Sequence, residues 1–479
     1  MSATRIAEIR ARRIWDSRGR PTVEADVRLE GGAIGRGIAP AGASRGSREA
    51  IDLRDGGTAL GGFGVDRVLR AIREEIAPAL LGLNATDQSR IDKTMIALDG
   101  TAQKSRLGGN ALIAVSLAVL SAAAAAAGQP LWRHLAGATP VRLPLPEIQI
   151  FGGGAHAGRR IDIQDFMVMP VGAGDFAEAL VMAAEIYRAA GAIMAERGTL
   201  HGVADEGGWW PDFATNEEAL ETLLRAIERA GFRPAEQVTI SLDIAASEFG
   251  CNGTYRLSRS LQPGARMHDD APSPNPLPRR GGEGSSSPSP RLRGEGRGEG
   301  RELDTAEMIG MLGGWLDRFP IAAMEDPLAE DDADGMRQFT ALYGNRVQVI
   351  GDDFLVTDAK LIEAAAAVGG CNAALIKPNQ AGTVSETVAG LDAARRGGMA
   401  TVISARSGET EDATLAHLAV GWNCGQLKVG SFARSERMAK WNEVLRIAEQ
   451  AGAQATFAGR AAAKPPSPAL AGEGRRGGA

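Results

Sequence analysis

Cysteine is scarce in this sequence: Cys251, Cys371 and Cys424 are the three cysteines in 479 residues. An odd, widely spaced set does not form the disulfide framework of small secreted domains, and it fits a reducing compartment. None of the three has the CxxC spacing that is typical of zinc sites. We therefore expect a cytoplasmic protein, and the cysteines give no support for zinc.

An excess of basic residues is also missing. Lys and Arg number 53 against 59 Asp and Glu, which gives a net charge of −6, and this balance does not favour nucleic-acid binding. The N-terminal stretch MSATRIAEIRARRIWDSRGR lacks the apolar core of a signal peptide. A mildly acidic chain can still bind a small anion locally, through a metal ion or through single Arg and Lys side chains.

Long uncharged stretches are rare as well. Residues 111–127, ALIAVSLAVLSAAAAAA, are nearly long enough to span a bilayer. Six of them are consecutive alanines, which favour a helix but are only weakly hydrophobic. We predict a buried helix, with a membrane segment as the alternative.

The chain is long enough to bury a large core and to form two domains. In TVEADVRL, residues 22–29, apolar side chains occupy every second position, which is the period of a half-buried strand. Helical patterns follow and end with the alanine-rich stretch. We therefore expect a small α+β domain over residues 1–137.

From about residue 138, short apolar runs alternate with amphipathic helices. One helix is marked by the capping-box spacing of Thr215 and Glu218 and by Gly231 at its end. Repeated strand–helix units predict parallel strands and favour a closed β/α barrel, here over residues 138–460. The apolar runs are VTISLD, IAAMED, VQVIGDD, AALIKPN, ATVISAR and QLKVG.

Two segments lack the apolar residues that a folded core requires. An insert in the barrel, at about residues 261–302, contains PSPNPLPRRGGEGSSSPSPRLRGEGRGEG, and the tail, residues 461–479, repeats its PSPxLxGEG phrase. Both are rich in Pro, Gly, Ser and Arg, which predicts disorder. A functional basic patch is the alternative, although glutamates in the insert dilute its arginines.

Charged residues stand at the ends of the predicted barrel strands. Taken alone, the acidic stretch IAAMEDPLAEDD could be a solvated turn, but six charged strand ends in series favour a site. The carboxyl ends of parallel barrel strands share one face, where active sites are built. Three carboxylates from successive strands suit Mg²⁺, and the cations beyond them could hold an anion or move a proton. The acids are Asp243, Glu325, Asp326, Asp352 and Asp353, and the cations are Lys377, Arg406 and Lys428.

The sequence resembles enolase, the phosphopyruvate hydratase of glycolysis, over about residues 5–260 and 303–460. The resemblance implies a small N-terminal α+β domain, a three-stranded meander plus helices, followed by an enolase-type β/α barrel. It implies a Mg²⁺-dependent lyase that dehydrates 2-phosphoglycerate to phosphoenolpyruvate. It also implies a small phosphorylated carboxylate as substrate and a homodimer, without nucleic-acid or membrane partners. The matching phrases include WDSRGRPTVE, APAGASRG, GGGAHA, ADEGG, LDIAASEF, MEDPLAEDD, GDDFLVT, LIKPNQAGT and ARSERMAKWN.

The resemblance also implies a role for each site residue. A base removes the proton beside the substrate carboxylate, and an acid helps the neighbouring hydroxyl to leave. In a cationic, metal-rich site the pKa of the basic lysine should be lowered. A lone histidine is more often structural, but the GGGAHA context favours an active-site role for His156. The implied catalytic residues are Lys377 as base, Glu206 as acid, Asp165 and His156; the metal ligands are Asp243, Glu325, Asp352 and Ser44 of a mobile loop; and the substrate is bound by Arg406, Ser407, Lys428, Glu325 and Asp352.

Several positions depart from the family pattern, and they cluster at this site. The His of the family's Ser-His-Arg-Ser is Ala405, and the Glu after Ile-Gln is Asp165, which is one methylene shorter. A misplacement near 1 Å can cost on the order of a hundredfold in rate. A slower enolase, a paralogue acting on a different carboxylate, and a non-catalytic binding protein therefore remain alternatives. The other departures are Ala41 for Ser, Arg45 for Thr, Gly152 for Asn, Ala204 for Gly and Pro378 for Val.

Overall fold

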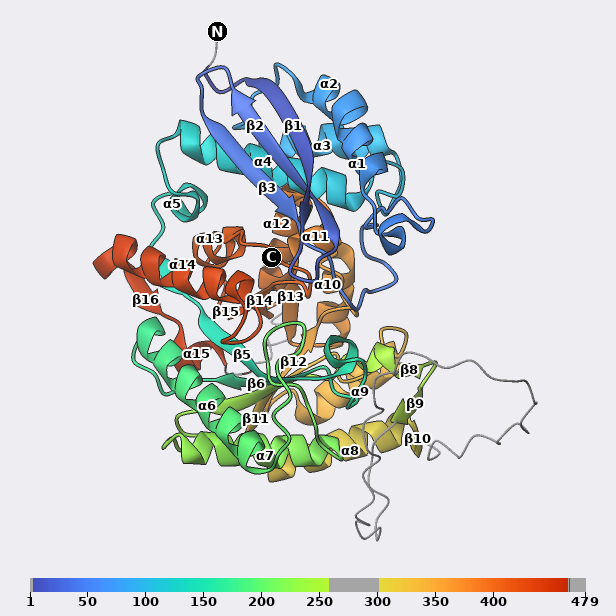
Figure 1. The fold of residues 1–479 in the computed structure, drawn as a ribbon, viewed down its shortest axis with the longest axis vertical. Helices are drawn as coiled ribbons and strands as arrows, with labels where there is room; N and C mark the ends of the chain where they lie inside the picture. The colour runs from blue at the N-terminus through green and yellow to red at the C-terminus, as the bar shows by residue number, and fades with distance from the viewer. Residues whose placement is uncertain (1–2, 258–300, 464, 466–479) are drawn as a thin grey trace, which may run out of the picture.

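The computed structural model describes residues 3–257, 301–463 and 465. Figure 1 shows a smaller N-terminal domain at the top and a larger domain, built around a barrel, below it. The predicted insert and tail lie largely outside the described residues, so the disorder predicted for them stays a prediction.

An antiparallel sheet with the order β1-β2-β3 forms one layer of the N-terminal domain. The alternation predicted for its central strand is present only in part: Val23 and Val27 are fully buried and Arg28 is exposed, but Glu24 on the polar face is buried as well. The strands are β1 (Ile6–Trp15), β2 (Pro21–Leu29) and β3 (Ile34–Ala39).

The alanine-rich stretch forms α4 (Gly109–Ala126), which packs against β2 and β3. A Cβ atom at Gly35 of β3 would lie 2.0 Å from the backbone nitrogen of Ala122, so glycine lets the strand and the helix approach at backbone distance. Among the described residues, α4 is the one helix long and apolar enough to cross a membrane, but 83% of it is buried inside the protein. The prediction of a buried helix is confirmed.

Shorter helices complete the N-terminal domain. In Figure 1 most of them lie to the right of the sheet. These helices are η1 (Ala59–Gly62), α1 (Asp66–Ala71), the π-helical turn η2 (Ile72–Ile76), α2 (Ala77–Leu80), α3 (Gln88–Asp99) and α5 (Leu131–Ala136).

Eight strands close the barrel in the order β11-β12-β13-β14-β15-β5-β6-β7, so the predicted fold class is confirmed. Neighbouring strands are parallel except at β6, which runs antiparallel to β5 and β7. The expectation of parallel strands is therefore wrong for β6, because a short apolar run does not indicate its own direction. The reversal places the first residue of β6, Asp165, beside Asp243 at the barrel mouth. The strands are β5 (Leu145–Gly152), β6 (Asp165–Met169), β7 (Thr239–Asp243), β11 (Ile321–Glu325), β12 (Gln348–Gly351), β13 (Ala373–Ile376), β14 (Ala400–Ser404) and β15 (Gln426–Lys428).

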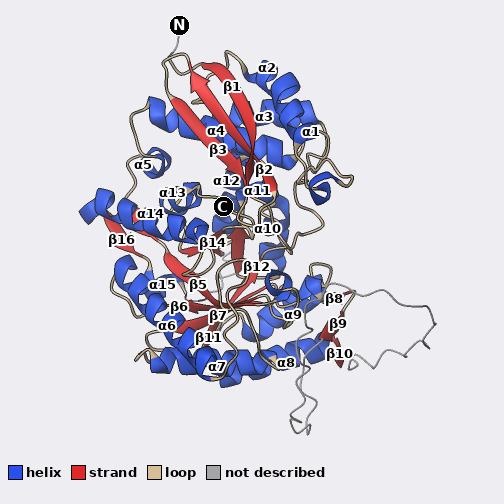
Figure 2. Ribbon diagram, in the orientation of Figure 1, coloured by secondary structure: helices blue, strands red, loops and turns tan. Residues whose placement is uncertain are grey.

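Helices surround the barrel, as the blue elements around the red strands show in Figure 2. The helix predicted from its cap begins after Thr215, whose side chain accepts the Glu218 backbone N–H at 3.1 Å. The Glu218 side chain accepts the backbone N–H of Ala214 at 2.7 Å. The helices are α6 (Phe176–Glu196), α7 (Asn216–Arg229), α8 (Thr305–Arg318), α9 (Ala333–Tyr343), α10 (Ala359–Val368), α11 (Pro378–Ala381), α12 (Val384–Arg396), α13 (Thr414–Gly421), α14 (Ser435–Ala451) and α15 (Gly459–Ala462).

A small antiparallel sheet flanks the position of the predicted insert. Leu257, the last residue of β9, pairs with Arg301, the first residue of β10. The described chain therefore stops and resumes at neighbouring backbone positions. This sheet contains β8 (Gly250–Cys251), β9 (Thr254–Leu257) and β10 (Arg301–Asp304), and elsewhere β4 (Val141–Leu143) pairs with β16 (Ala455–Phe457).

Candidate active site

Three carboxylates come from three strands at the barrel mouth. Asp243 ends β7, Glu325 ends β11, and Asp352 directly follows β12. Lys428, at the end of β15, donates to Asp243 Oδ2 and to Glu325 Oε2, both at 2.7 Å. Asp243 and Glu325 therefore reach the same point from different strands, as expected for strand ends that share one face.

Lys377 follows β13 and pairs with Asp352, its Nζ lying 2.5 Å from Asp352 Oδ2. Burial lowers the pKa of Lys377, but the Asp352 carboxylate more than offsets burial, and the net shift is upward. The expectation of a lowered pKa concerned a metal-rich site, and it stays a prediction for the protein with magnesium bound. In this arrangement Asp352 holds Lys377 in its protonated form.

The chemistry of these donors suits a hard cation. Glu325 is fully buried, and burial together with Asp243 holds the pKa of Glu325 well above its usual range. Within the described part of the chain, its Oε1 atom has no hydrogen-bond partner, although it is buried. A buried carboxylate oxygen without a partner is costly, and a bound divalent cation would supply the missing contact.

A second acidic group adjoins the first. The side chain of Asp326 accepts the backbone N–H groups of Asp352, at 2.8 Å, and Asp353, at 2.7 Å. Ligand atoms of these three residues lie within 4.8 Å of one another, an arrangement that could also hold a metal ion. Burial and Asp352 raise the pKa of Asp326 to about 8. The sequence indicated that Asp326 is an acidic strand end, but it did not indicate that this side chain binds the backbone of the turn after β12.

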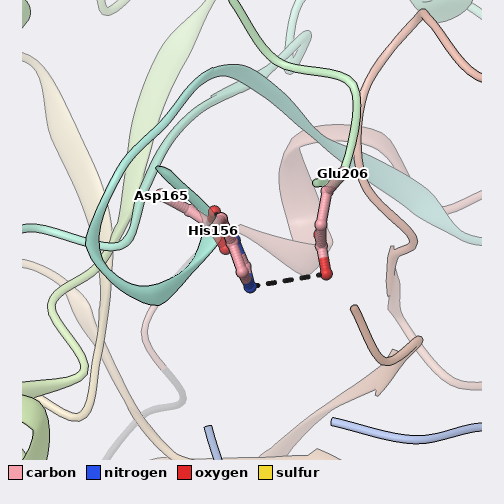
Figure 3. A group of neighbouring side chains, drawn as sticks. All are labelled: His156, Asp165 and Glu206. Atoms are coloured by element: carbon pink, nitrogen blue, oxygen red, sulfur yellow. Dashed lines mark hydrogen bonds and ion pairs between the residues drawn. The ribbon is translucent and has the colours of Figure 1, made fainter. Parts of the chain in front are cut away.

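His156 lies between two carboxylates (Figure 3). Its Nδ1 atom is 3.0 Å from Asp165 Oδ1, and its Nε2 atom is 3.7 Å from Glu206 Oε1. Burial lowers the pKa of His156, but Asp165 and Glu206 outweigh burial and raise it to about 9. His156 is therefore a cation at neutral pH, with an N–H on each ring nitrogen.

The shortened side chain of Asp165 still reaches this group. Its Oδ1 atom accepts a hydrogen bond from Gln149 Nε2, and its Oδ2 atom lies 3.4 Å from Lys428 Nζ. Burial raises the pKa of Asp165, but His156 and Lys428 outweigh burial and hold it below its usual range. Asp165 is thus an ionised carboxylate. Sequence reasoning missed Gln149, which lies on β5, a strand absent from the predicted runs.

The loop that carries Ser44 lies against the two residues expected to bind phosphate. Arg406 donates to the backbone oxygen of Ser44 at 3.0 Å and forms an ion pair with Glu49, also at 3.0 Å. The backbone N–H of Ala43 donates to Ser407 Oγ at 3.0 Å. Glu49 was not predicted, because nothing local to its sequence indicates a partner at position 406.

Most of the predicted site residues line one small cavity. Its volume is about 20 Å³, which is room for about one water molecule. Glu325 and Asp352 are joined to its wall by their ion pairs with Lys428 and Lys377. The cavity is lined by Ser44, His156, Gln164, Asp165, Glu206, Asp243, Lys377, Ser404, Ala405, Arg406, Ser407 and Lys428.

Comparison with known families gives two matches. A model described as the enolase N-terminal domain matches residues 6–135, and one described as the enolase C-terminal TIM barrel domain matches residues 140–267 and 291–466. The chain belongs to the enolase family. The resemblance seen in the sequence is confirmed, and the enolase domains identify a lyase of the enolase superfamily. The gap between the two barrel matches falls inside the predicted insert.

Proposed function

We propose that the chain is a Mg²⁺-dependent lyase that dehydrates 2-phosphoglycerate to phosphoenolpyruvate. The observation that carries this proposal is that Lys377 and Glu206, the proposed base and acid, line the same cavity. The groups for an anionic substrate, Arg406, Ser407 and Lys428, line it too. Base, acid and anion-binding groups are what removal of a proton and a hydroxyl from a small phosphorylated acid requires.

In the proposed reaction, Arg406 and Ser407 hold the phosphate and Lys428 holds the carboxylate. Lys377 takes the proton from the carbon beside the carboxylate, and the C–H electron pair moves toward that carboxylate. Glu206 then protonates the hydroxyl on the next carbon, which leaves as water while the carbon–carbon double bond forms. The ion pair with Asp352 raises the pKa of Lys377, so a weaker ion pair would favour the neutral, basic form of the lysine.

Magnesium, when bound, would neutralise the charge that builds on the substrate carboxylate. The proposed ligands of a first magnesium are Asp243, Glu325 and Asp352, and Ser44 of the loop over the site would contribute a ligand to a second magnesium. The unpartnered Oε1 atom of Glu325 supports this assignment, because a cation there would satisfy an otherwise isolated acceptor. The ion pairs of Asp243, Glu325 and Asp352 with lysines also support this ligand assignment, because an ammonium group and a metal ion can each neutralise the charge of a buried carboxylate.

The direct test is to follow phosphoenolpyruvate formation from 2-phosphoglycerate, with Mg²⁺ and after its removal with a chelator. Magnesium-dependent turnover that is abolished in Lys377→Ala supports the proposal. If the wild-type protein exchanges the substrate's α-proton with D₂O but forms no phosphoenolpyruvate, the base step is present and the leaving group or substrate has been misassigned. If neither reaction occurs in the presence of Mg²⁺, the proposed activity is wrong.

A paralogue that acts on a different carboxylate is the second candidate. Ala405 lines the cavity beside Arg406, where the family has a histidine, so the site offers a methyl group in place of a polar ring. A screen of small α-hydroxy and α-phospho acids for Mg²⁺-dependent α-proton exchange separates the two candidates. Exchange that is faster with another acid than with 2-phosphoglycerate favours the paralogue, and binding without exchange favours a non-catalytic protein.

The family resemblance also supports a cytoplasmic homodimer as part of this proposal. The sheet of the N-terminal domain has β1 at its edge, and β1 ends at Trp15, which is 54% exposed. Light scattering coupled to size-exclusion chromatography tests the assembly. A mass of one chain at micromolar concentration would remove the dimer from the proposal without affecting the proposed chemistry.

A further inference from the structure

The segment that carries Glu206, residues 199–213, is attached to α6 on the outside of the barrel. Tyr187 of α6 donates from its Oη atom to the backbone oxygen of Gly207 at 2.9 Å, one residue after Glu206. Trp209 donates from Nε1 to the backbone oxygen of Tyr187, also at 2.9 Å. The Tyr187 and Trp209 rings stack with their centroids 4.5 Å apart and an interplanar angle of 16°.

Gly191 makes room for this arrangement, one turn further along α6. A Cβ atom at Gly191 would lie 2.7 Å from Cζ2 of Trp209, well inside van der Waals contact. Glycine in a helix interior is less favourable than alanine, so Gly191 lowers the intrinsic stability of α6. What the glycine gains is a surface on α6 against which the Trp209 indole can lie.

The inner side of the same segment is attached to the barrel. The backbone N–H of Trp209 donates to the oxygen of Ile150 at 2.8 Å, and that of Gly208 donates to Gln149 Oε1 at 2.8 Å. Gly207 has φ 91°, and a Cβ atom there would lie 2.4 Å from the backbone oxygen of Ala433. The segment is therefore held from both sides, with little space for backbone movement next to Glu206.

We propose that Tyr187, Gly191 and Trp209 form a clamp on α6 that sets the position of the Glu206 carboxyl group in the cavity. Tyr187 and Trp209 are positioning residues, because they act through the backbone of Gly207 and do not line the cavity. This inference rests on the proposed role of Glu206 as the acid. A displacement of that carboxyl group near 1 Å is expected to slow the elimination step by about a hundredfold.

Gly191→Ala is the sharpest test, because it should strengthen α6 while pushing the Trp209 ring away. The matched control is Gly310→Ala in α8, an exposed helix glycine where an added Cβ atom meets nothing within 4 Å. We expect Gly191→Ala to lower kcat for phosphoenolpyruvate formation by about tenfold to a hundredfold, with KM within about twofold. Gly310→Ala should leave both parameters and the melting temperature unchanged.

Exchange of the substrate's α-proton with D₂O separates positioning from a general defect. Proton removal depends on Lys377, whereas departure of the hydroxyl depends on Glu206. A displaced Glu206 should therefore lower elimination while exchange persists, and Tyr187→Phe should do the same to a smaller extent. Equal losses of exchange and elimination in Gly191→Ala, or unchanged turnover, would overturn the clamp.

Amide hydrogen exchange tests the clamp even if the proposed function fails. Should the wild-type protein not turn over 2-phosphoglycerate, the exchange rates of the Gly208 and Trp209 amides still report on the segment. Faster exchange at these two amides in Gly191→Ala, but not in Gly310→Ala, supports the clamp. Equal rates in both variants and in the wild type would refute it.

Discussion

A Cβ atom at Gly152 would lie 2.7 Å from the Cβ atom of Ala204. These are two of the positions that depart from the family pattern, with Gly152 in place of Asn and Ala204 in place of Gly. The methyl group of Ala204 takes up space that any side chain at position 152 would need. The two departures are therefore coupled: the side chain lost at position 152 of β5 leaves the space that the methyl group of Ala204 occupies.

Restoring asparagine at position 152 alone should destabilise the protein. Overpacking against Ala204 is expected to cost about 1–3 kcal/mol in the free energy of unfolding. Adding Ala204→Gly should recover part of this loss, with a coupling energy of about 0.5–3 kcal/mol in a double-mutant cycle. Urea unfolding of the wild type, both single variants and the double variant measures this coupling. Additive effects of the two substitutions would contradict it.

Lys428→Met should destabilise the metal-free protein. The substitution leaves Asp243 and Glu325 buried without the ammonium group that contacts both, and loss of one partner of a buried pair costs about 3–5 kcal/mol. A divalent cation would then face no competing ammonium, so Mg²⁺ should raise the melting temperature of Lys428→Met more than that of the wild type. A thermal-shift titration with MgCl₂ measures both. A smaller Mg²⁺ effect in the variant would argue against Asp243 and Glu325 as ligands.

The folded protein should lose stability as the pH rises from about 6.5 to about 9. His156 has its pKa raised from 6.5 to about 9, so its protonated form stabilises the fold fully below 6.5 and progressively less above that value. A shift of this size corresponds to at most about 3 kcal/mol, because one pKa unit is 1.36 kcal/mol. Urea unfolding of the wild type and His156→Gln across this range measures the effect. The difference in stability between them should shrink with rising pH, and a constant difference would contradict the prediction.

Restoring the family residues at positions 405 and 165 should accelerate phosphoenolpyruvate formation. Asp165→Glu extends the carboxylate by one methylene, and Ala405→His returns a polar ring beside Arg406. If the site is an impaired enolase, the two substitutions together should raise kcat/KM by about tenfold to a hundredfold. Ala405→Val with Asp165→Glu is the control, since it adds bulk at position 405 without a polar ring. No gain in the histidine variant would show that these two departures do not limit the rate.

The barrel mouth was predictable because charge at strand ends is a local signal. Asp243, Glu325, Asp352, Lys377 and Lys428 each end or directly follow an apolar run, and a parallel barrel brings such positions together. Their pairing was not predictable, because it depends on distances between strands that the sequence does not contain.

The direction of β6 and the contacts of the loops could not be predicted, for the same reason. The apolar residues of β6 fit either orientation, so Asp165 was placed from the family pattern alone. Glu49 contacts Arg406 across the boundary between the two domains, and no periodic pattern links residues so far apart. The raised pKa of Lys377 follows from its ion pair with Asp352, which only the structure reveals.

The pairing of Leu257 with Arg301 makes the β9–β10 sheet a natural splice point in the barrel. Facing residues of antiparallel strands lie about 5 Å apart. A segment that connects Leu257 to Arg301 therefore needs only to have its two ends close together. Each doubling of such a connection costs only about 0.6 kcal/mol in closure entropy. A reporter peptide or a small domain with adjacent termini could therefore replace residues 258–300.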